Sequence, residues 1–553
     1  MLEHLKRREV YSISILLLLY LYLGLFTLTD YGLTWDAWEY YYGDKNLNYL
    51  LSLDSDHLDF QKRSIDLYER GDHPDFYDVC KSYKDNDIQT GPHLIWPLGP
   101  TLSSLCKYIF YDKLGIFDPI DAHHLFPLFC TFLLILIVYL YLLKFEGFWP
   151  AIIAALIIAL YPRYLAHSHN NIKDPALVLF FIASLISCHL AFLNKSWKWM
   201  LGCAILIGLA LATKANALFI PVILLPWFVT ACIKEKSWTQ IKEHRAYWSL
   251  VIAGPLIAFF VMFICWPLLW QNFPENLSLY IKSLGERGYQ GDPHWSIDSI
   301  RNAIITMPLA ICFAFVLGTA KLLYDAIKKQ SSLYYIMWYC CLIIPILRVS
   351  VPGAKDFDVI RHWLEFVPAL AMIIATGFYK AVLLLKPYLA REEYIDRLVA
   401  GAFLMLLLPV FFWNLKNHPN QGVYYNPAIG NLAGAQERGY AQSTDYWGQS
   451  YRQAFNWLNE NVAKEKPKLF IAVAEHIGFF SRQIWLDQRI ELHSMNYFQQ
   501  EYQASNVPVY IIYITRKDWY HFHAKLMNEL VKRPAVHEIE VDGGVILRIH
   551  KIK

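Results

Sequence analysis

Charged residues are scarce in this chain. Only 18% of its 553 residues are Asp, Glu, Lys or Arg, whereas soluble domains average about 25%. The deficit lies between Tyr11 and Trp413, where apolar runs long enough to cross a ~30 Å hydrocarbon core recur. This composition excludes an ordinary soluble protein and predicts a polytopic α-helical membrane protein.

Other absences narrow the possibilities. The ten cysteines include no Cys-x-x-Cys pair, so no metal or redox motif is visible. The first apolar run is not followed by an Ala-x-Ala cleavage site, and we therefore interpret it as a retained span. The net charge of +3 gives no indication of nucleic-acid binding. No repeat or low-complexity segment is present in the sequence.

The apolar runs predict eleven spans, near residues 11–28, 122–143, 148–165, 175–193, 198–213, 215–233, 246–266, 302–323, 333–349, 363–385 and 398–413. Lys and Arg gather in the N-terminal "HLKRREV" and in the loops after the even-numbered spans, which predicts a cytoplasmic N-terminus. An odd count then places the rest of the chain after the last span outside. We expect a multi-pass protein of the plasma (inner) membrane with an external or periplasmic C-terminal domain.

Two regions follow from this pattern. Residues 1–413 form the transmembrane region, with a large first outer loop at 29–121, and residues 414–553 form a small α/β domain. In that domain "KLFIAVA" and "VPVYIIYI" suit buried strands, and the stretch around Asp542-Gly543-Gly544 alternates like a hairpin. Cys80 and Cys106 both lie in the first outer loop, where a disulfide is permitted; burial of Cys106 as a thiol is the alternative.

Ionisable residues at the ends of spans gather on the predicted outer side. In "LTWDAWEYYYGDK", Asp36 and Glu39 are three residues apart and share a face if the stretch is helical. Such a carboxylate can take a proton from a hydroxyl nucleophile. Arg and Lys from other outer loops can hold a phosphate and stabilise its charge as it leaves. A phosphate at the membrane rim with its tail in the bilayer is a lipid phosphate, so the residues suggest sugar transfer from a polyprenyl-phosphate-sugar.

The order of these motifs resembles that of a family. "TWDAWEYYYG", "YPRYLAHSHNNIKDP", "KDFDVIRHWLEFVPALA" and the stretch from "HPNQGVYYNP" to "SYRQAFNWL" are similar to GT-C class glycosyltransferases. The similarity is to the protein O-mannosyltransferase and aminoarabinose-transferase type, in a bacterial subgroup. Asp36 stands at the family's first acid, but Ala37 stands where a second acid often follows. Whether Glu39 substitutes for that acid is left open.

These patterns assign candidate roles. The predicted catalytic residues are Asp36, as base, and Glu39. The predicted lipid-phosphate ligands are Arg361, Arg163, Lys214, Lys173 and His362. The predicted sugar or acceptor contacts are Asp174, His294 and Trp295. Each has a structural alternative: Asp174 before Pro175 also suits a helix N-cap, and Trp295 an interfacial anchor. We expect no metal site, because His167 and His169 do not share a helical face.

The sequence therefore predicts an inverting glycosyltransferase that moves a sugar from a polyprenyl-phosphate donor to an external acceptor. No other cofactor and no nucleic-acid partner are expected, and the acceptor (lipid, glycan or protein) is open. One alternative is a carrier or flippase of lipid-linked sugars without chemistry. Another is a glycan polymerase or ligase that uses a lipid-diphosphate donor.

Overall fold

The computed structural model describes residues 6–54, 96–288, 291–330, 332–354, 357–389, 391, 394–440 and 442–553. Within these ranges, eight helical segments are long and apolar enough to cross a membrane. They are α1 with η1 (Arg7–Asp30), α5 (Pro119–Phe145), α8 (Asp174–Asn194), η5 with α10 (Ala215–Glu235), α11 (Arg245–Ile264), α15 (Leu309–Ile327), α17 with η8 (Phe366–Tyr388) and α18 (Tyr394–Lys416). The chain is an integral membrane protein.

Three of the eleven predicted spans do not meet that length on their own. α6 (Phe148–Leu160) bends by 65° into α7 (Pro162–Asn170), while α9 (Trp197–Thr213) and α16 (Tyr334–Leu347) are shorter apolar helices. The bend falls at Pro162, the first residue of α7, because proline cannot donate the backbone hydrogen bond that would continue α6. By length and composition the described residues hold eight such helices, or nine with the bent pair, and the two remaining predicted spans coincide with the shorter apolar helices α9 and α16.

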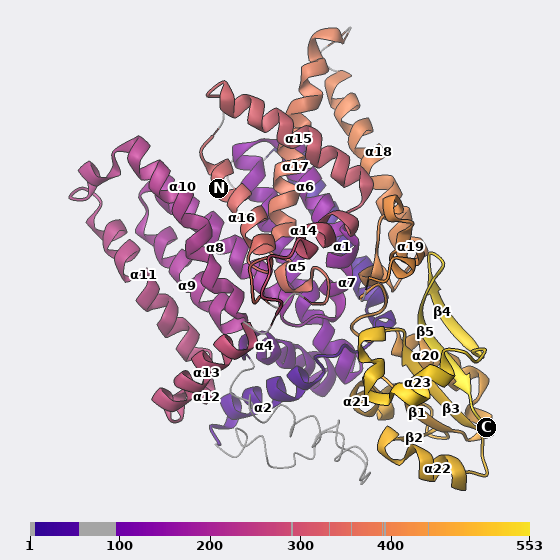
Figure 1. Ribbon diagram of the computed structural model, residues 1–553. Coiled ribbons are helices and arrows are strands. Elements are labelled where there is room, and N and C mark those ends of the chain that lie inside the picture. Colours follow the sequence, from indigo (N-terminus) through magenta and orange to yellow (C-terminus); the bar gives the residue numbers. More distant parts are fainter. Residues whose placement is uncertain are drawn as a thin grey trace.

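The helices differ in how deeply they lie in the bundle (Figure 1). In α8, 83% of the apolar window is buried within the protein, whereas in α11 the share is 17%. α8 therefore lies in the bundle core, and α11 presents most of its apolar side chains outward, as lipid contact requires. Close helix approach uses glycine: a Cβ on Gly377 of α17 would lie 2.4 Å from the carbonyl oxygen of Gly318 in α15.

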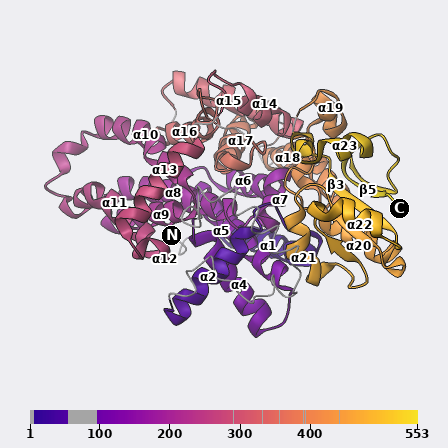
Figure 2. The ribbon, with the colours of Figure 1, turned by 60° about the horizontal axis from the view of Figure 1, so that its bottom comes forward.

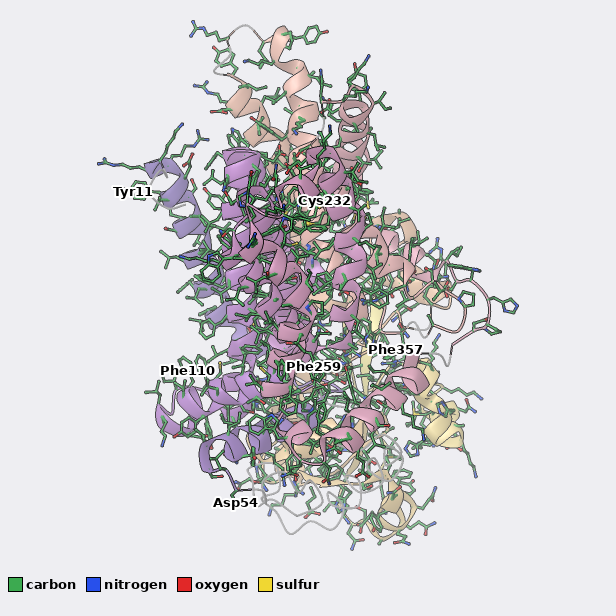
Figure 3. The ribbon with its side chains drawn as sticks, turned by 90° about the vertical axis from the view of Figure 1, so that its left-hand side faces the viewer. Tyr11, Asp54, Phe110, Cys232, Phe259 and Phe357 are labelled. Atoms are coloured by element: carbon green, nitrogen blue, oxygen red, sulfur yellow. The ribbon has the colours of Figure 1, made fainter. Side chains whose placement is uncertain are left out.

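Short helices cross one end of the bundle, which we call the site end (Figures 1 and 2). α2 and α4 pack closely there, since a Cβ on Gly43 would lie 2.3 Å from the carbonyl oxygen of Pro100. In Figure 3, Asp54 near the end of α2 lies toward this end, whereas Tyr11 of α1 and Cys232 of α10 lie toward the other. The short helices are α2 (Trp38–Ser52), α4 (Leu98–Lys107), α12 (Pro267–Trp270) and α13 (Phe273–Gly288), while α14 (Asp298–Ile305) lies farther along the bundle, before α15.

The C-terminal region carries a five-stranded sheet of order β2-β1-β3-β5-β4. β1 (Lys468–Ile471) pairs in parallel with β2 (Glu491–His493) and β3 (Val509–Ile514), with Phe470 opposite Ile511. β5 (Gly544–Lys551) runs antiparallel to β3 and to β4 (His537–Val541). The predicted strands and hairpin are confirmed, while the three-residue β2 was not predicted. The helices of this region are α19 (Asn431–Glu437), α20 (Tyr451–Asn461), α21 (Glu475–Trp485), α22 (Phe498–Ala504) and α23 (Ala524–Leu530).

Ion pairs and hydrogen bonds connect the C-terminal domain to the site end of the bundle. Arg452 of α20 forms a two-pronged ion pair with Asp121 at the start of α5, at 2.5 and 3.0 Å. Trp485 Nε1 donates to Asp118 Oδ2 at 2.9 Å. Tyr40 of α2 also belongs to the apolar core of the sheet domain. The C-terminal domain and the segment after α1 therefore fold against each other.

Candidate active site

Asp36 lies in a turn just before α2, at the site end. Its Oδ2 atom accepts from Arg361 Nη1 at 2.6 Å and from Lys173 Nζ at 3.5 Å. Two backbone hydrogen bonds of Trp35 hold this turn. The Trp35 N–H donates to the carbonyl of Trp447 at 2.7 Å, and the Trp35 carbonyl accepts from His476 Nε2 at 2.9 Å. Since His476 belongs to the C-terminal domain, that domain helps to place the candidate base.

Glu39 shares a cation with Asp36. Lys173 Nζ also donates to Glu39 Oε1, so the two carboxylates predicted to share a face do meet at one ammonium group. Burial and nearby Asp36 raise the pKa of Glu39 to about 7, although Lys173 opposes this. Burial would likewise raise the pKa of Asp36, but Lys173 and Arg361 outweigh it and hold this pKa at about 2. Asp36 is therefore firmly ionised, and Glu39 is the acid that titrates near neutral pH.

Asp174 forms a second pair behind the first. Its Oδ1 accepts from Lys214 Nζ at 2.5 Å and its Oδ2 from Asn171 Nδ2 at 2.7 Å. Asn171 Oδ1 accepts from the backbone N–H groups of Lys173 and Asp174 at the start of α8. Asn171 thus fills the N-capping role that is the structural alternative for Asp174. The Asp174 side chain is thus available to pair with Lys214, and only 2% of it is exposed.

Arg361 lies in the short helix η7 (Arg361–Trp363), and its neighbours fix it. The carbonyl of His362 accepts from Arg348 Nη2 at 2.5 Å and from Asn216 Nδ2 at 2.7 Å. The guanidinium lies 4.8 Å from the ring centre of Trp447. Burial, Arg361 and Lys214 lower the pKa of His362 well below its usual range, so this imidazole is neutral.

Two charged residues at this site were not assigned from the sequence. Asp358 Oδ2 pairs with Arg361 Nη2 at 2.8 Å, and Asp358 Oδ1 lies 3.1 Å from Arg516 Nη1. Arg516 comes from the C-terminal domain, in which the sequence showed no catalytic pattern. The site therefore combines four carboxylates, Asp36, Glu39, Asp174 and Asp358, with four cations, Lys173, Lys214, Arg361 and Arg516.

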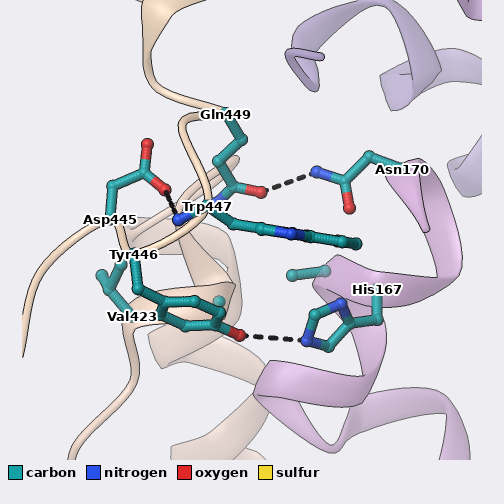
Figure 4. A pocket seen from close by; sticks show the side chains of 9 residues that line it. His167, Asn170, Val423, Asp445, Tyr446, Trp447 and Gln449 are labelled. Carbon is teal, nitrogen blue, oxygen red and sulfur yellow. Dashed lines mark hydrogen bonds between the residues drawn. The ribbon is translucent and has the colours of Figure 1, made fainter. Parts of the chain in front are cut away.

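The loop at residues 445–449, in the C-terminal region, contacts α7 through side chains (Figure 4). Tyr446 Oη lies 3.0 Å from His167 Nε2, and Asn170 Nδ2 donates to Gln449 Oε1 at 2.8 Å. The cavity between them has a volume of about 10 Å³, which is space for one water molecule at most. A larger cavity of about 390 Å³ lies in the C-terminal domain, and its lining includes none of the eight charged residues above. Neither cavity is therefore lined by the charged cluster.

Other predicted site residues lie apart from this cluster. Arg163 is fully buried, donates to the carbonyl of Tyr424 at 3.1 Å and lies 4.8 Å from the ring centre of Tyr425. His294 pairs with Asp292 at 2.7 Å on an exposed loop, and Trp295 beside it is 71% exposed. Cys80 lies outside the described residues, and Cys106 is a partly buried free thiol, which agrees with the alternative of a buried thiol rather than with the disulfide.

The arrangement has a definite chemical capacity. Of the four carboxylates, Asp36 is the one with the largest exposed share of its side chain, 24% against 11% or less for the others. The hydroxyl group of a small molecule can therefore contact Asp36, and the adjacent Arg361 and Lys173 can bind an anion.

Comparison with known proteins agrees with this architecture. A family model described as dolichyl-phosphate-mannose-protein mannosyltransferase matches residues 113–266. Two crystal structures of ArnT from Cupriavidus metallidurans superpose on the chain with a TM-score of 0.50, one bound to undecaprenyl phosphate and one in the apo state. Their identities are 15% and 13%, and each alignment covers 97% of both chains.

A third structure is less similar. It is the archaeal oligosaccharyltransferase AglB from Archaeoglobus fulgidus, with a TM-score of 0.40, 14% identity, and coverage of 79% of this chain and 65% of that one. A search of curated proteins finds no match. The ArnT likeness spans nearly the whole chain and the family match falls within it. The chain therefore has the fold of the ArnT membrane glycosyltransferase, and over residues 113–266 it is similar to the mannosyltransferase family.

Proposed function

We propose that this protein transfers a sugar from a polyprenyl-phosphate donor to an acceptor at the site end, with inversion at the anomeric carbon. One observation carries the proposal: the partly open carboxylate of Asp36 is bound by Arg361 and Lys173, the cations best suited to hold a phosphate. Base and phosphate ligands are thus adjacent, as a reaction at the donor's phosphate-bearing carbon requires. The basic loops at the opposite end favour an external site.

Binding of the donor would change the charge balance at the site. Without donor, Arg361 and Lys173 are engaged by carboxylates, so a phosphate must compete with Asp36 for them. When Arg361 turns to the phosphate, Asp36 loses part of the attraction that lowers its pKa. Its basicity then rises at the moment when a substrate is present, which suits a general base.

The chemical step follows from these positions. Asp36 removes the proton of the acceptor hydroxyl, and the acceptor oxygen attacks the anomeric carbon from the side opposite the phosphate. A new glycosidic bond forms while the bond to the phosphate oxygen breaks. The departing polyprenyl phosphate keeps the electron pair, and Arg361, Lys173 and Lys214 stabilise its charge. The proton remains on Asp36 until the products leave.

The donor class is supported by the ArnT structure, which holds undecaprenyl phosphate and shares this fold. The PMT family description names a dolichyl-phosphate sugar as well. Both point to a lipid monophosphate rather than a diphosphate. The sugar and the acceptor, whether lipid, glycan or protein, are open.

The test separates binding from turnover. Asp36→Asn keeps the size of the side chain but removes the proton acceptor, so sugar transfer should fall by about 10²–10⁴-fold while donor binding persists. Purified wild type and variant are compared for binding of a polyprenyl-phosphate-sugar and for release of polyprenyl phosphate. Near-normal transfer by folded Asp36→Asn protein would exclude the role of Asp36 as base.

The same assay distinguishes the alternatives. A carrier would bind the lipid-linked sugar but release no polyprenyl phosphate, in wild type as in the variant. A polymerase or ligase would turn over a lipid-diphosphate donor in preference to the monophosphate. Either result would replace the proposed function.

A further inference from the structure

Arg361 is held on two sides. Its Nη1 contacts Asp36, the proposed base, and its Nη2 contacts Asp358, which in turn pairs with Arg516 of the C-terminal domain. We propose that Asp358 and Arg516 are positioning residues that hold Arg361 for the donor phosphate, so that the C-terminal domain is part of the donor site. This inference rests on the proposed function.

Arg516 is itself fixed in place. It follows β3, and the preceding Thr515 donates its N–H to the carbonyl of Ile546, which continues the sheet pairing. Its guanidinium donates to the carbonyl of Tyr446 and lies 3.5 Å from the ring centre of Trp519. Only 4% of its side chain is exposed. Arg516 therefore presents its charge to Asp358 from a rigid part of the domain.

Asp358 is also constrained by its backbone. Asp358 and Val359 have φ values of 58° and 59°, the left-handed region that a β-branched residue such as Val359 rarely occupies. The Val359 N–H donates to Gln442 Oε1 at 2.9 Å, so a residue near the C-terminal domain also supports this conformation. A strained conformation persists only where its surroundings determine it, and here it directs the carboxylate at Arg361.

The charge of Asp358 is the informative feature. A carboxylate this close to a phosphate site opposes anion binding by charge alone. Its benefit must then lie in geometry: while Nη1 exchanges Asp36 for the phosphate, Nη2 stays anchored. An arginine already held in place loses less conformational freedom when the donor binds.

This conflict gives an experiment in which two explanations predict opposite signs. Asp358→Asn removes a negative charge, so charge alone predicts tighter donor binding. Positioning predicts that binding of the donor weakens and its KM rises, by about tenfold. Undecaprenyl phosphate binding to the purified full-length protein and the KM values for donor and acceptor are measured. The acceptor KM should change little.

Variants of Arg516 test the same chain of contacts, from Arg516 through Asp358 to Arg361. Arg516→Ala should raise the donor KM by several fold, and Arg516→Lys should restore part of the loss because it keeps the charge. The double variant with Asp358→Asn should be no worse than Asp358→Asn alone, since both act through one contact. Arg489→Ala is the matched control: this arginine pairs with Asp487 on the surface of the same domain and is 48% exposed.

Each outcome has one meaning. Equal or tighter donor binding by folded Asp358→Asn overturns the inference, as does an unchanged donor KM in Arg516→Ala. If Asp358→Asn does not fold, the Arg516→Ala and Arg516→Lys pair decides. If the wild type neither binds undecaprenyl phosphate nor transfers sugar, the proposed function fails and the inference fails with it. If the wild type does both, only the behaviour of the variants bears on the inference.

Discussion

The two ends of the bundle both carry ion pairs, but the pairs differ in burial and in the number of partners. At the end opposite the site, Glu146 after α5 pairs with Lys380 of α17 at 3.2 Å, and the hydroxyl of Tyr335 accepts from that lysine at 2.7 Å. One acid meets one cation there. At the site end, Lys173 and Arg361 each contact two carboxylates.

This difference separates Lys380 from Lys173 and Arg361 in what an incoming anion would cost. A one-to-one pair is satisfied, and removing one partner leaves the other charge unpaired. A cation shared between two carboxylates can give up one of them to an incoming anion and remain paired with the other. The site end is thus arranged for exchange, and the opposite end for stability.

Removal of one cation from each end gives the largest expected contrast. Arg361→Ala should weaken donor binding and lower transfer by about 10²–10³-fold, because the phosphate is present in both ground and transition states. Lys380→Ala should lower the melting temperature by a few degrees and leave the kinetics of transfer nearly unchanged. A loss of turnover in folded Lys380→Ala protein as large as that of Arg361→Ala would abolish the contrast.

The second test uses pH to probe the shared lysine. Glu39, whose pKa lies at about 7, is neutral below that pH and adds a negative charge beside the donor phosphate above it. Donor affinity should therefore fall by up to about tenfold as pH rises from 6 to 8. Glu39→Gln should remove this dependence and keep the high affinity across the range.

The control for this test is Asp298→Asn, which neutralises an acid that is 51% exposed on α14. It should leave the pH profile of donor binding as in the wild type. An unaltered profile in Glu39→Gln would assign the titration to another group.

The smallest effect is expected on the exposed loop. His294→Ala and Trp295→Ala change side chains that lie outside the charged cluster, so donor and acceptor KM values should each change by about twofold or less. The sequence-based prediction that they contact sugar or acceptor requires a larger change. A tenfold rise in either KM would show that this loop meets the substrate.

Much of this architecture follows from local pattern. The apolar runs predict the bundle, and the Asp542-Gly543 sequence predicts the hairpin. In the structure these two residues have φ values of 47° and 77°, as a tight hairpin turn requires. The charges near span ends predict a common face, and seven of the predicted residues do meet there: Asp36, Glu39, Lys173, Asp174, Lys214, Arg361 and His362.

The remaining features depend on contacts between distant parts of the chain. Arg516 follows a buried strand of the C-terminal domain, and nothing in its sequence neighbourhood indicates that it reaches Asp358, 158 residues earlier by their numbers. Arg163 has the residue type and position of a phosphate ligand, yet its guanidinium packs against Tyr425. Charge identity alone cannot say which arginine of several faces the site.

The ion pairs that cross from the C-terminal domain to the bundle have a consequence for modularity. A chain ending after α18 would lose Arg452 as the partner of Asp121 and Arg516 as one of the two partners of Asp358. The bundle and the C-terminal domain thus share buried ion pairs, so we expect them to depend on each other for stability. Exchange of the C-terminal domain between relatives would succeed only where the incoming domain carries both arginines and the receiving bundle carries both aspartates.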